Sequence, residues 1–86
     1  MARAKTSISE IARIAAARKA CADGTFEAVI TENMLSMADV ADALQIHNSN
    51  VYRWMRGTTR PGRAMALRIA DFLDGLPGEL QASRRR

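Results

Sequence analysis

The sequence predicts an all-α fold, a compact bundle of about five short helices. Apolar residues recur at the three- and four-residue spacing of a helix, and no stretch shows the alternation typical of a strand. Turn residues divide the chain into short pieces. At 86 residues, the chain has length for one small domain, which excludes a doubly wound sheet or a barrel. We therefore expect no ligand-sensing domain.

The first helix is expected over Ile8–Ala22. Ser7 and Glu10 fit a capping box at its start, and Gly24 is suited to its end. One face of this helix is apolar and carries Ile8, Ile11, Ala12 and Ala15.

A second helix is expected from Thr25, which can act as its N-cap, to about Asn33. Its apolar side carries Phe26, Val29 and Ile30.

A third helix is expected over Met37–Leu44, with Ser36 and Asp39 as a capping pair and with Val40, Ala41 and Leu44 facing inward. A fourth begins near Asn48 and ends at Gly57.

The last helix is expected to open at Pro61-Gly62 and to end at about Leu73, because Gly75, Pro77 and Gly78 follow. Its inward residues are Ala66, Ile69, Ala70 and Leu73. The predicted organisation is a basic arm with an added helix (1–24), a central domain (25–74) and a basic tail (75–86) that includes Arg84–Arg86. Arg3 and Lys5 form the basic part of the arm.

Charge is segregated along the chain, although the net charge is only +4. Residues 21–42 contain five acidic side chains and no Lys or Arg. Residues 43–70 reverse this pattern, with no acid and five arginines: Arg53, Arg56, Arg60, Arg63 and Arg68. Such a run predicts an electropositive surface suited to phosphates and guanine edges.

Enzyme chemistry is not predicted, and neither is a cofactor. The single cysteine, Cys21, lies on a helix far in sequence from the single histidine, His47, and no glycine-rich phosphate loop or metal-ligand spacing is present. We expect Cys21 to pack as a small apolar residue. Met34, Met37, Met55 and Met65 are expected to fill gaps in the core. No targeting segment or membrane span is visible, which favours a soluble, cytoplasmic protein.

The stretch Leu35–Gly57 carries the functional signal. Two helices joined by a short turn need a small residue where they cross, which Ala41 supplies. They also need shared core residues, at the spacing shown by Val40, Leu44, Ile46, Val51 and Trp54. This arrangement is typical of a helix-turn-helix, whose second helix enters the major groove of DNA.

The segment resembles the Cro/repressor-type (XRE-like) helix-turn-helix family of phage repressors and bacterial regulators. The likeness extends upstream to Phe26 and Val29, and downstream through Gly57–Pro61 and Leu67–Ala70 to Leu73. The resemblance covers about residues 26–73 and implies a fold like that of the phage lambda repressor.

Three positions depart from the family pattern. Gln45 stands where the family usually has a turn glycine, and Met34 replaces another frequent glycine. Met37 occupies a position where family members often carry a phosphate-contacting Gln. The helix over Ile8–Ala22 is an addition to the pattern.

Helical geometry divides the fourth helix into two sides. With Val51 inward, Trp54 and Met55 lie within about 60° of it, and Ser49, Tyr52, Arg53 and Arg56 lie on the far side. The residues expected to contact bases are Asn48, Ser49, Tyr52 and Arg53. Those expected to contact phosphates are His47, Asn50, Arg56, Thr58, Thr59, Arg60 and Arg63. A Tyr52 ring packed on a neighbour, and a His47 that merely caps the helix, remain open alternatives.

The leading functional hypothesis is a sequence-specific regulator of transcription that binds double-stranded DNA and represses by occupying an operator. The resemblance implies a homodimer on a palindromic operator. The candidate seams are the Ile8–Ala22 helix and the pair Leu76 and Leu80. No membrane partner and no small-molecule ligand are expected. Two alternatives stay open: an antitoxin-like or phage accessory protein that also binds a partner protein, and a pure protein-interaction module.

Overall fold

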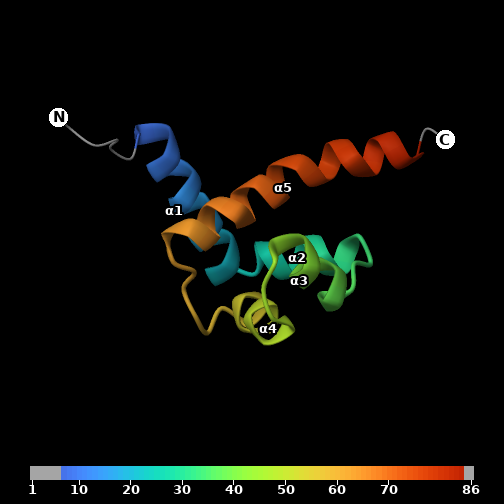
Figure 1. Ribbon diagram of the computed structural model, residues 1–86, viewed down its shortest axis with the longest axis horizontal. Coiled ribbons are helices and arrows are strands. Elements are labelled where there is room, and N and C mark those ends of the chain that lie inside the picture. Colours follow the sequence, from blue (N-terminus) through green and yellow to red (C-terminus); the bar gives the residue numbers. More distant parts are fainter. Residues whose placement is uncertain (1–6, 85–86) are drawn as a thin grey trace.

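The computed structural model describes residues 7–84 and contains, within them, five helices and no strand (Figure 1). The helices are α1 (Ile8–Ala22), α2 (Thr25–Glu32), α3 (Met37–Leu44), α4 (Asn48–Arg56) and α5 (Arg63–Arg84). The predicted all-α bundle is therefore confirmed. The basic residues expected at the two ends, Arg3, Lys5, Arg85 and Arg86, lie outside the described range.

α1 begins as predicted, but its expected apolar face is not the one that packs. Ser7 Oγ accepts a hydrogen bond from the Glu10 amide (3.0 Å), and Glu10 Oε1 accepts one from the Ser7 amide (3.3 Å). Ile8 and Ile11 are 86% and 55% exposed, and Ala12 and Ala15 are exposed as well. The buried side of α1 consists of Ile14, Ala17, Ala20 and Cys21.

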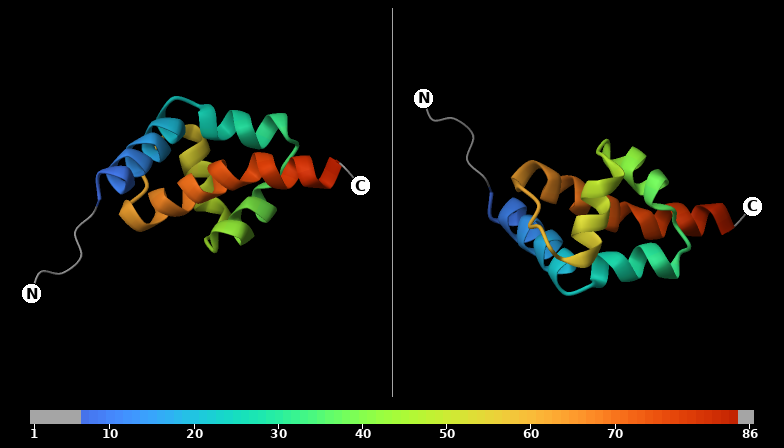
Figure 2. Two further views of the ribbon diagram at one scale, coloured as in Figure 1. Left: turned by 90° about the horizontal axis from the view of Figure 1, so that it is seen from above. Right: turned by 90° about the horizontal axis from the view of Figure 1, so that it is seen from below.

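α1 crosses the N-terminal half of α5 and also contacts α2 and α4 (Figure 2). Its Arg13 forms ion pairs with Asp71 and Asp74 on α5. The helix added before the predicted central domain is thus part of the common core.

Thr25 is not the N-cap of α2, which corrects the sequence-based prediction. The N-cap is Gly24, with a left-handed backbone (φ 88°). Asp23 Oδ1 instead accepts a hydrogen bond from the Thr25 amide at 2.9 Å. The Asp23 carboxylate therefore satisfies a free amide of the first turn from outside the helix. The sequence pattern assigns this capping role to the Thr25 hydroxyl.

α3 and α4 form the predicted pair. Ser36 Oγ accepts from the Asp39 amide at 3.0 Å and caps α3. The turn between the helices passes through Gln45, whose φ and ψ of 59° and 48° are left-handed, as expected from a glycine-like position. Met34, the second position where the family favours glycine, also has a positive φ of 55°.

α5 continues well beyond Leu73, so the prediction that the last helix ends there is wrong. It runs through Gly75, Pro77 and Gly78 to Arg84 (Figure 1). A proline removes the hydrogen bond to the carbonyl four residues earlier and crowds that carbonyl, which can kink a helix without ending it. Leu76 and Leu80 are half-buried and lie on the side of α5 that faces α2.

The core lies where all five helices meet. Phe26, Val51, Ala66 and Ile69 are each fully buried, and the rings of Phe26 and Phe72 meet edge to face at 6.3 Å. Met37, Met55 and Met65 pack against this core as expected, whereas Met34 is 90% exposed and fills no gap. Within residues 7–84, no helix is both long and apolar enough to span a membrane.

Candidate nucleic-acid interface

α4 has one buried side and one exposed side, as its sequence pattern predicts. Val51 and Trp54 are 0% and 5% exposed, and Met55 is half-buried. Two large anchors one turn apart fix the rotation of the helix, so the residues opposite them face solvent. The helix ends at Gly57, which adopts a left-handed φ of 70° and donates its amide to the Trp54 carbonyl at 3.2 Å.

The four residues expected to contact bases, Asn48, Ser49, Tyr52 and Arg53, are all exposed on α4. The guanidinium of Arg56 lies over the Tyr52 ring, 5.5 Å from its centroid. This contact matches the alternative reading of Tyr52 as a ring packed on a neighbour, and it leaves the ring half exposed. Tyr52 and Arg56 therefore form a preformed pair beside Arg53.

The segment after α4 carries the next group of polar side chains. The Thr58 amide and hydroxyl both donate to the Arg53 carbonyl, at 3.0 and 3.2 Å. Thr58, Thr59 and Arg60 are exposed, whereas Pro61 is buried. This segment extends the polar surface of α4 toward the start of α5.

Three of the residues expected to contact phosphates differ in position or burial from the exposed residues at the end of α4. His47 is the N-cap residue of α4 and is exposed, but its side chain makes no capping hydrogen bond. Asn50 is half-buried. Arg63 opens α5 and lines a pocket with Ile11 and Ile14 of α1, so it belongs to a different helix pair from α4.

The arginines of the acid-free run have two distinct environments. Among residues 7–82, whose side chains the structure describes, the ion pairs are those of Arg13 with α5, so Arg53, Arg56 and Arg60 keep unneutralised charge. Arg68 differs, because its Nη1 donates to the Leu44 carbonyl at 3.1 Å and joins α5 to α3.

Sequence reasoning missed Arg18, whose Nε donates to the Pro61 carbonyl at 3.0 Å. The two residues are 43 positions apart, so no local pattern links them.

Cys21 is buried next to this contact, as predicted for a small apolar residue. Burial, with a smaller contribution from Asp23, raises the pKa of its thiol to about 11. Within the described residues, no group of three or more His, Cys, Asp or Glu side chains could hold a metal ion.

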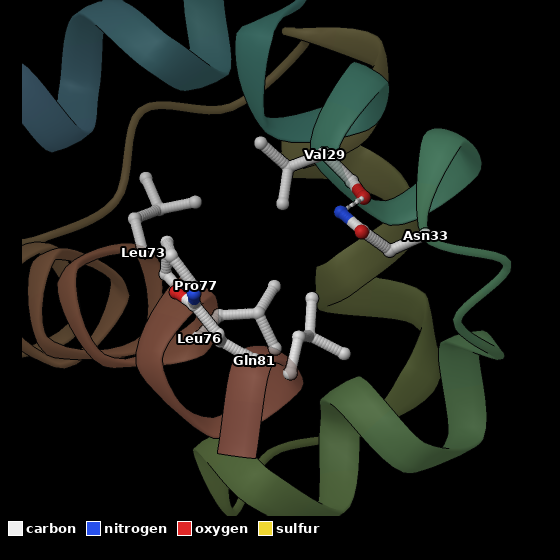
Figure 3. A pocket seen from close by; sticks show the side chains of 7 residues that line it. Val29, Asn33, Leu73, Leu76, Pro77 and Gln81 are labelled. Carbon is white, nitrogen blue, oxygen red and sulfur yellow. Dashed lines mark hydrogen bonds between the residues drawn. The ribbon is translucent and has the colours of Figure 1, made fainter. Parts of the chain in front are cut away.

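A second surface feature is an apolar groove between α2 and the C-terminal half of α5 (Figure 3). It has a volume of about 570 Å³. Its lining consists of Val29, Asn33, Leu73, Leu76, Pro77, Leu80 and Gln81. The Asn33 amide donates to the Val29 carbonyl at 2.8 Å, so this side chain is tied back along its own helix and leaves the groove open.

Two helices joined by a tight turn, the second anchored by Val51 and Trp54 and presenting arginines to solvent, define a helix-turn-helix DNA-binding protein. A family model described as helix-turn-helix matches residues 27–80, which is more than half of the chain. The chain therefore belongs to the helix-turn-helix family of Cro/C1-type DNA-binding transcription regulators, and the resemblance seen in the sequence is confirmed. Searches of curated proteins and of solved structures gave no significant match. α1 precedes the matched region.

Proposed function

We propose that this regulator is a sequence-specific repressor that inserts α4 into the major groove of an operator and excludes polymerase from it. The observation that carries the proposal is the polarity of α4. Its buried anchors, Val51 and Trp54, lie opposite an exposed face whose arginines have no acidic partner among the described side chains.

Base readout is assigned to Asn48, Ser49, Tyr52 and Arg53. An arginine fork matches the O6 and N7 acceptors of guanine, and an asparagine amide matches adenine. Asn48 and Ser49 begin the helix, and Arg53 follows one turn later on the same exposed face. This spacing supports readout of neighbouring base pairs by one helix.

Backbone contacts are assigned to His47, Asn50, Arg56, Thr58, Thr59, Arg60 and Arg63. Of these, Arg56, Thr58, Thr59 and Arg60 form a continuous exposed stretch at the end of α4. Phosphate contacts supply most of the affinity of such proteins and make it fall steeply as salt rises.

The test is selection of bound duplexes from a random DNA pool, followed by titration of variants on the selected site. Ser49→Ala and Arg53→Ala should each weaken binding and relax the preference at one base pair, by about 1–3 kcal/mol for the arginine. Ser9→Ala and Lys19→Ala, at exposed positions of α1, are the matched controls. Unchanged preference in both α4 variants would contradict the assignment of α4, and failure of the wild type to enrich any sequence would support a protein-interaction module.

The proposed repressor acts as a homodimer on a palindromic operator, and the occupant of the α2–α5 groove is a second copy of the chain. Leu73, Leu76 and Leu80 recur at helical spacing along the groove and stay half-exposed to it. A symmetric pair would bury these leucines against one another, because a two-fold axis brings the same surface from both copies together. This supports the Leu76–Leu80 seam over the α1 seam.

Light scattering of the wild type and of Leu80→Glu tests the seam. The wild type should have twice the mass of the variant, and the variant should keep its helical circular dichroism. A wild type with the mass of one chain at all concentrations would contradict the homodimer.

A second candidate function adds a partner protein to DNA binding, as in the antitoxin-like alternative. The observation that favours it is the exposed pair Ile8 and Ile11 on α1, outside the family match. Ile11→Asp should then leave binding to the selected duplex unchanged and alter regulation of a reporter in the native host. Equal regulation by the wild type and the variant would contradict this second function.

A further inference from the structure

The end of α1 lies directly against the end of α4. A Cβ atom at Gly57 would stand 3.2 Å from the Cys21 carbonyl oxygen and 3.5 Å from that of Ala22. The residue that ends the recognition helix therefore has no free space on the side of α1. The contact joins a helix outside the family match to the helix that the family uses for DNA.

Arg18 makes the second contact between α1 and the segment after α4. Its Nε donates to the Pro61 carbonyl at 3.0 Å, and Pro61 itself is fully buried. α1 thus holds both ends of residues 57–61, the first by close packing against Gly57 and the last by a hydrogen bond.

The residues between these two ends have few bonds of their own. Thr58 is tied to the Arg53 carbonyl, but Thr59 and Arg60 take part in no hydrogen bond among the described residues. A segment with so few bonds is held mainly by its anchors. The conformation of Thr59 and Arg60 therefore depends on the anchor at Pro61.

The Arg18 side chain is well suited to this anchoring role. It is half-buried and lines a cavity of about 100 Å³ together with Cys21, Thr59 and Arg60. The planar guanidinium fixes the direction of the Nε–H bond. Lys19, its neighbour, is exposed and makes no such contact, which offers a matched control.

We propose that Arg18 is a positioning residue of the DNA interface, which acts through Pro61 to hold Thr59 and Arg60 where they meet a backbone phosphate. The inference rests on the proposed DNA contacts of that segment. It assigns to α1 a part in recognition that the matched family region does not contain.

A double-mutant cycle separates positioning from direct contact. Arg18→Met keeps the length of the side chain and removes its donors and charge, and Lys19→Met is the same change one residue later. Binding is measured on the selected duplex and on a random-sequence duplex over a range of salt. Arg18→Met and Arg60→Ala should each weaken binding, roughly two- to tenfold. Each should also reduce the slope of log K against log salt concentration by about 1, the contribution of one phosphate contact. The double variant should bind no more weakly than Arg60→Ala alone.

A second measurement uses the free protein, so that it does not depend on DNA. Amide order parameters of Thr59 and Arg60 should fall in Arg18→Met, toward the flexible range below about 0.6. They should stay at the wild-type value in Lys19→Met. Thermal unfolding of each variant establishes that the comparison is made between folded proteins.

Several results would overturn the inference. Additive losses of affinity from Arg18→Met and Arg60→Ala would show that Arg18 contacts DNA independently. An equal loss of affinity from Lys19→Met would show that the effect comes from net charge alone. Lower order parameters with unchanged affinity would overturn the positioning role while leaving the proposed function intact. A wild type that binds neither duplex would overturn the proposed function, and the positioning role with it.

Discussion

Arg68 Nη1 donates a hydrogen bond to the Leu44 carbonyl oxygen at 3.1 Å, and so joins α5 to the last turn of α3. The carbonyls at a helix C-terminus lack partners within the helix, and a cation there also interacts favourably with the helix dipole. Arg68 belongs to the same acid-free run as Arg53, but its donor is directed to the protein. Replacing Arg68 should therefore lower the stability of the fold, whereas replacing Arg53 should weaken DNA binding.

Arg68→Ala should lower the free energy of unfolding by about 1 kcal/mol, since a partly exposed charged donor is lost from a carbonyl. It should leave the salt slope of DNA binding unchanged. Arg53→Ala should do the reverse, with loss of binding and little change in stability. Urea unfolding and salt-dependent titration of both variants check this, and a slope reduced by Arg68→Ala at constant stability would contradict it.

The close contact between α1 and α4 predicts unequal costs at two left-handed glycines. Gly57 and Gly24 have φ values of 70° and 88°, but a Cβ at Gly24 would meet nothing within 4 Å. Gly24→Ala should cost about 1 kcal/mol from backbone strain alone. Gly57→Ala should cost about 2 kcal/mol or more, because its Cβ also crowds the Cys21 carbonyl. Denaturant midpoints measure the difference, and Gly62→Ala, at an open position without a positive φ, is the control.

The left-handed residue between α3 and α4 predicts a stabilising substitution. Gln45 has a φ of 59°, a conformation that costs a residue with a side chain about 1 kcal/mol. Gln45→Gly should raise the free energy of unfolding by roughly 0.5–1 kcal/mol. Glycine removes the backbone strain, but it also increases the conformational entropy of the unfolded chain, which offsets part of the gain. Ala43→Gly, inside α3, should instead destabilise by about 1 kcal/mol. Equal destabilisation by both changes would contradict the left-handed turn.

α3 and α4 could be predicted from the sequence because large side chains and strong caps agree there. Ser36 and Gly57 mark the ends, and Val51 and Trp54 leave only one side of α4 for the core. A large apolar residue has one favourable direction, so the exposed side of α4 followed from the spacing of its apolar residues.

The face of α1 and the end of α5 could not be predicted in the same way. Alanines occur around most of α1, and their small methyl groups indicate little about which side is buried, so packing on α5 decides it. At Pro77 and its neighbouring glycines the local signal predicts a helix end, yet α5 continues to Arg84, because a proline can kink a helix without ending it. The Arg18–Pro61 and Arg68–Leu44 hydrogen bonds join residues 43 and 24 positions apart, so only the folded chain reveals them.

The buried thiol of Cys21 predicts slow alkylation and a loss of stability at high pH. Burial raises its pKa from 9.0 to about 11, so at pH 8 the reactive thiolate is about a hundredfold rarer in the folded protein. A thiol reagent should therefore react at least that much more slowly with native protein than with protein in guanidinium. Because the folded pKa is the higher one, the thiol's contribution to stability is fully present below pH 9 and is lost as the pH rises through 11. Cys21→Ala, unfolded by urea at pH 8 and pH 10.5, should lack this part of the pH dependence, whereas rapid native labelling at pH 8 would contradict the buried thiol.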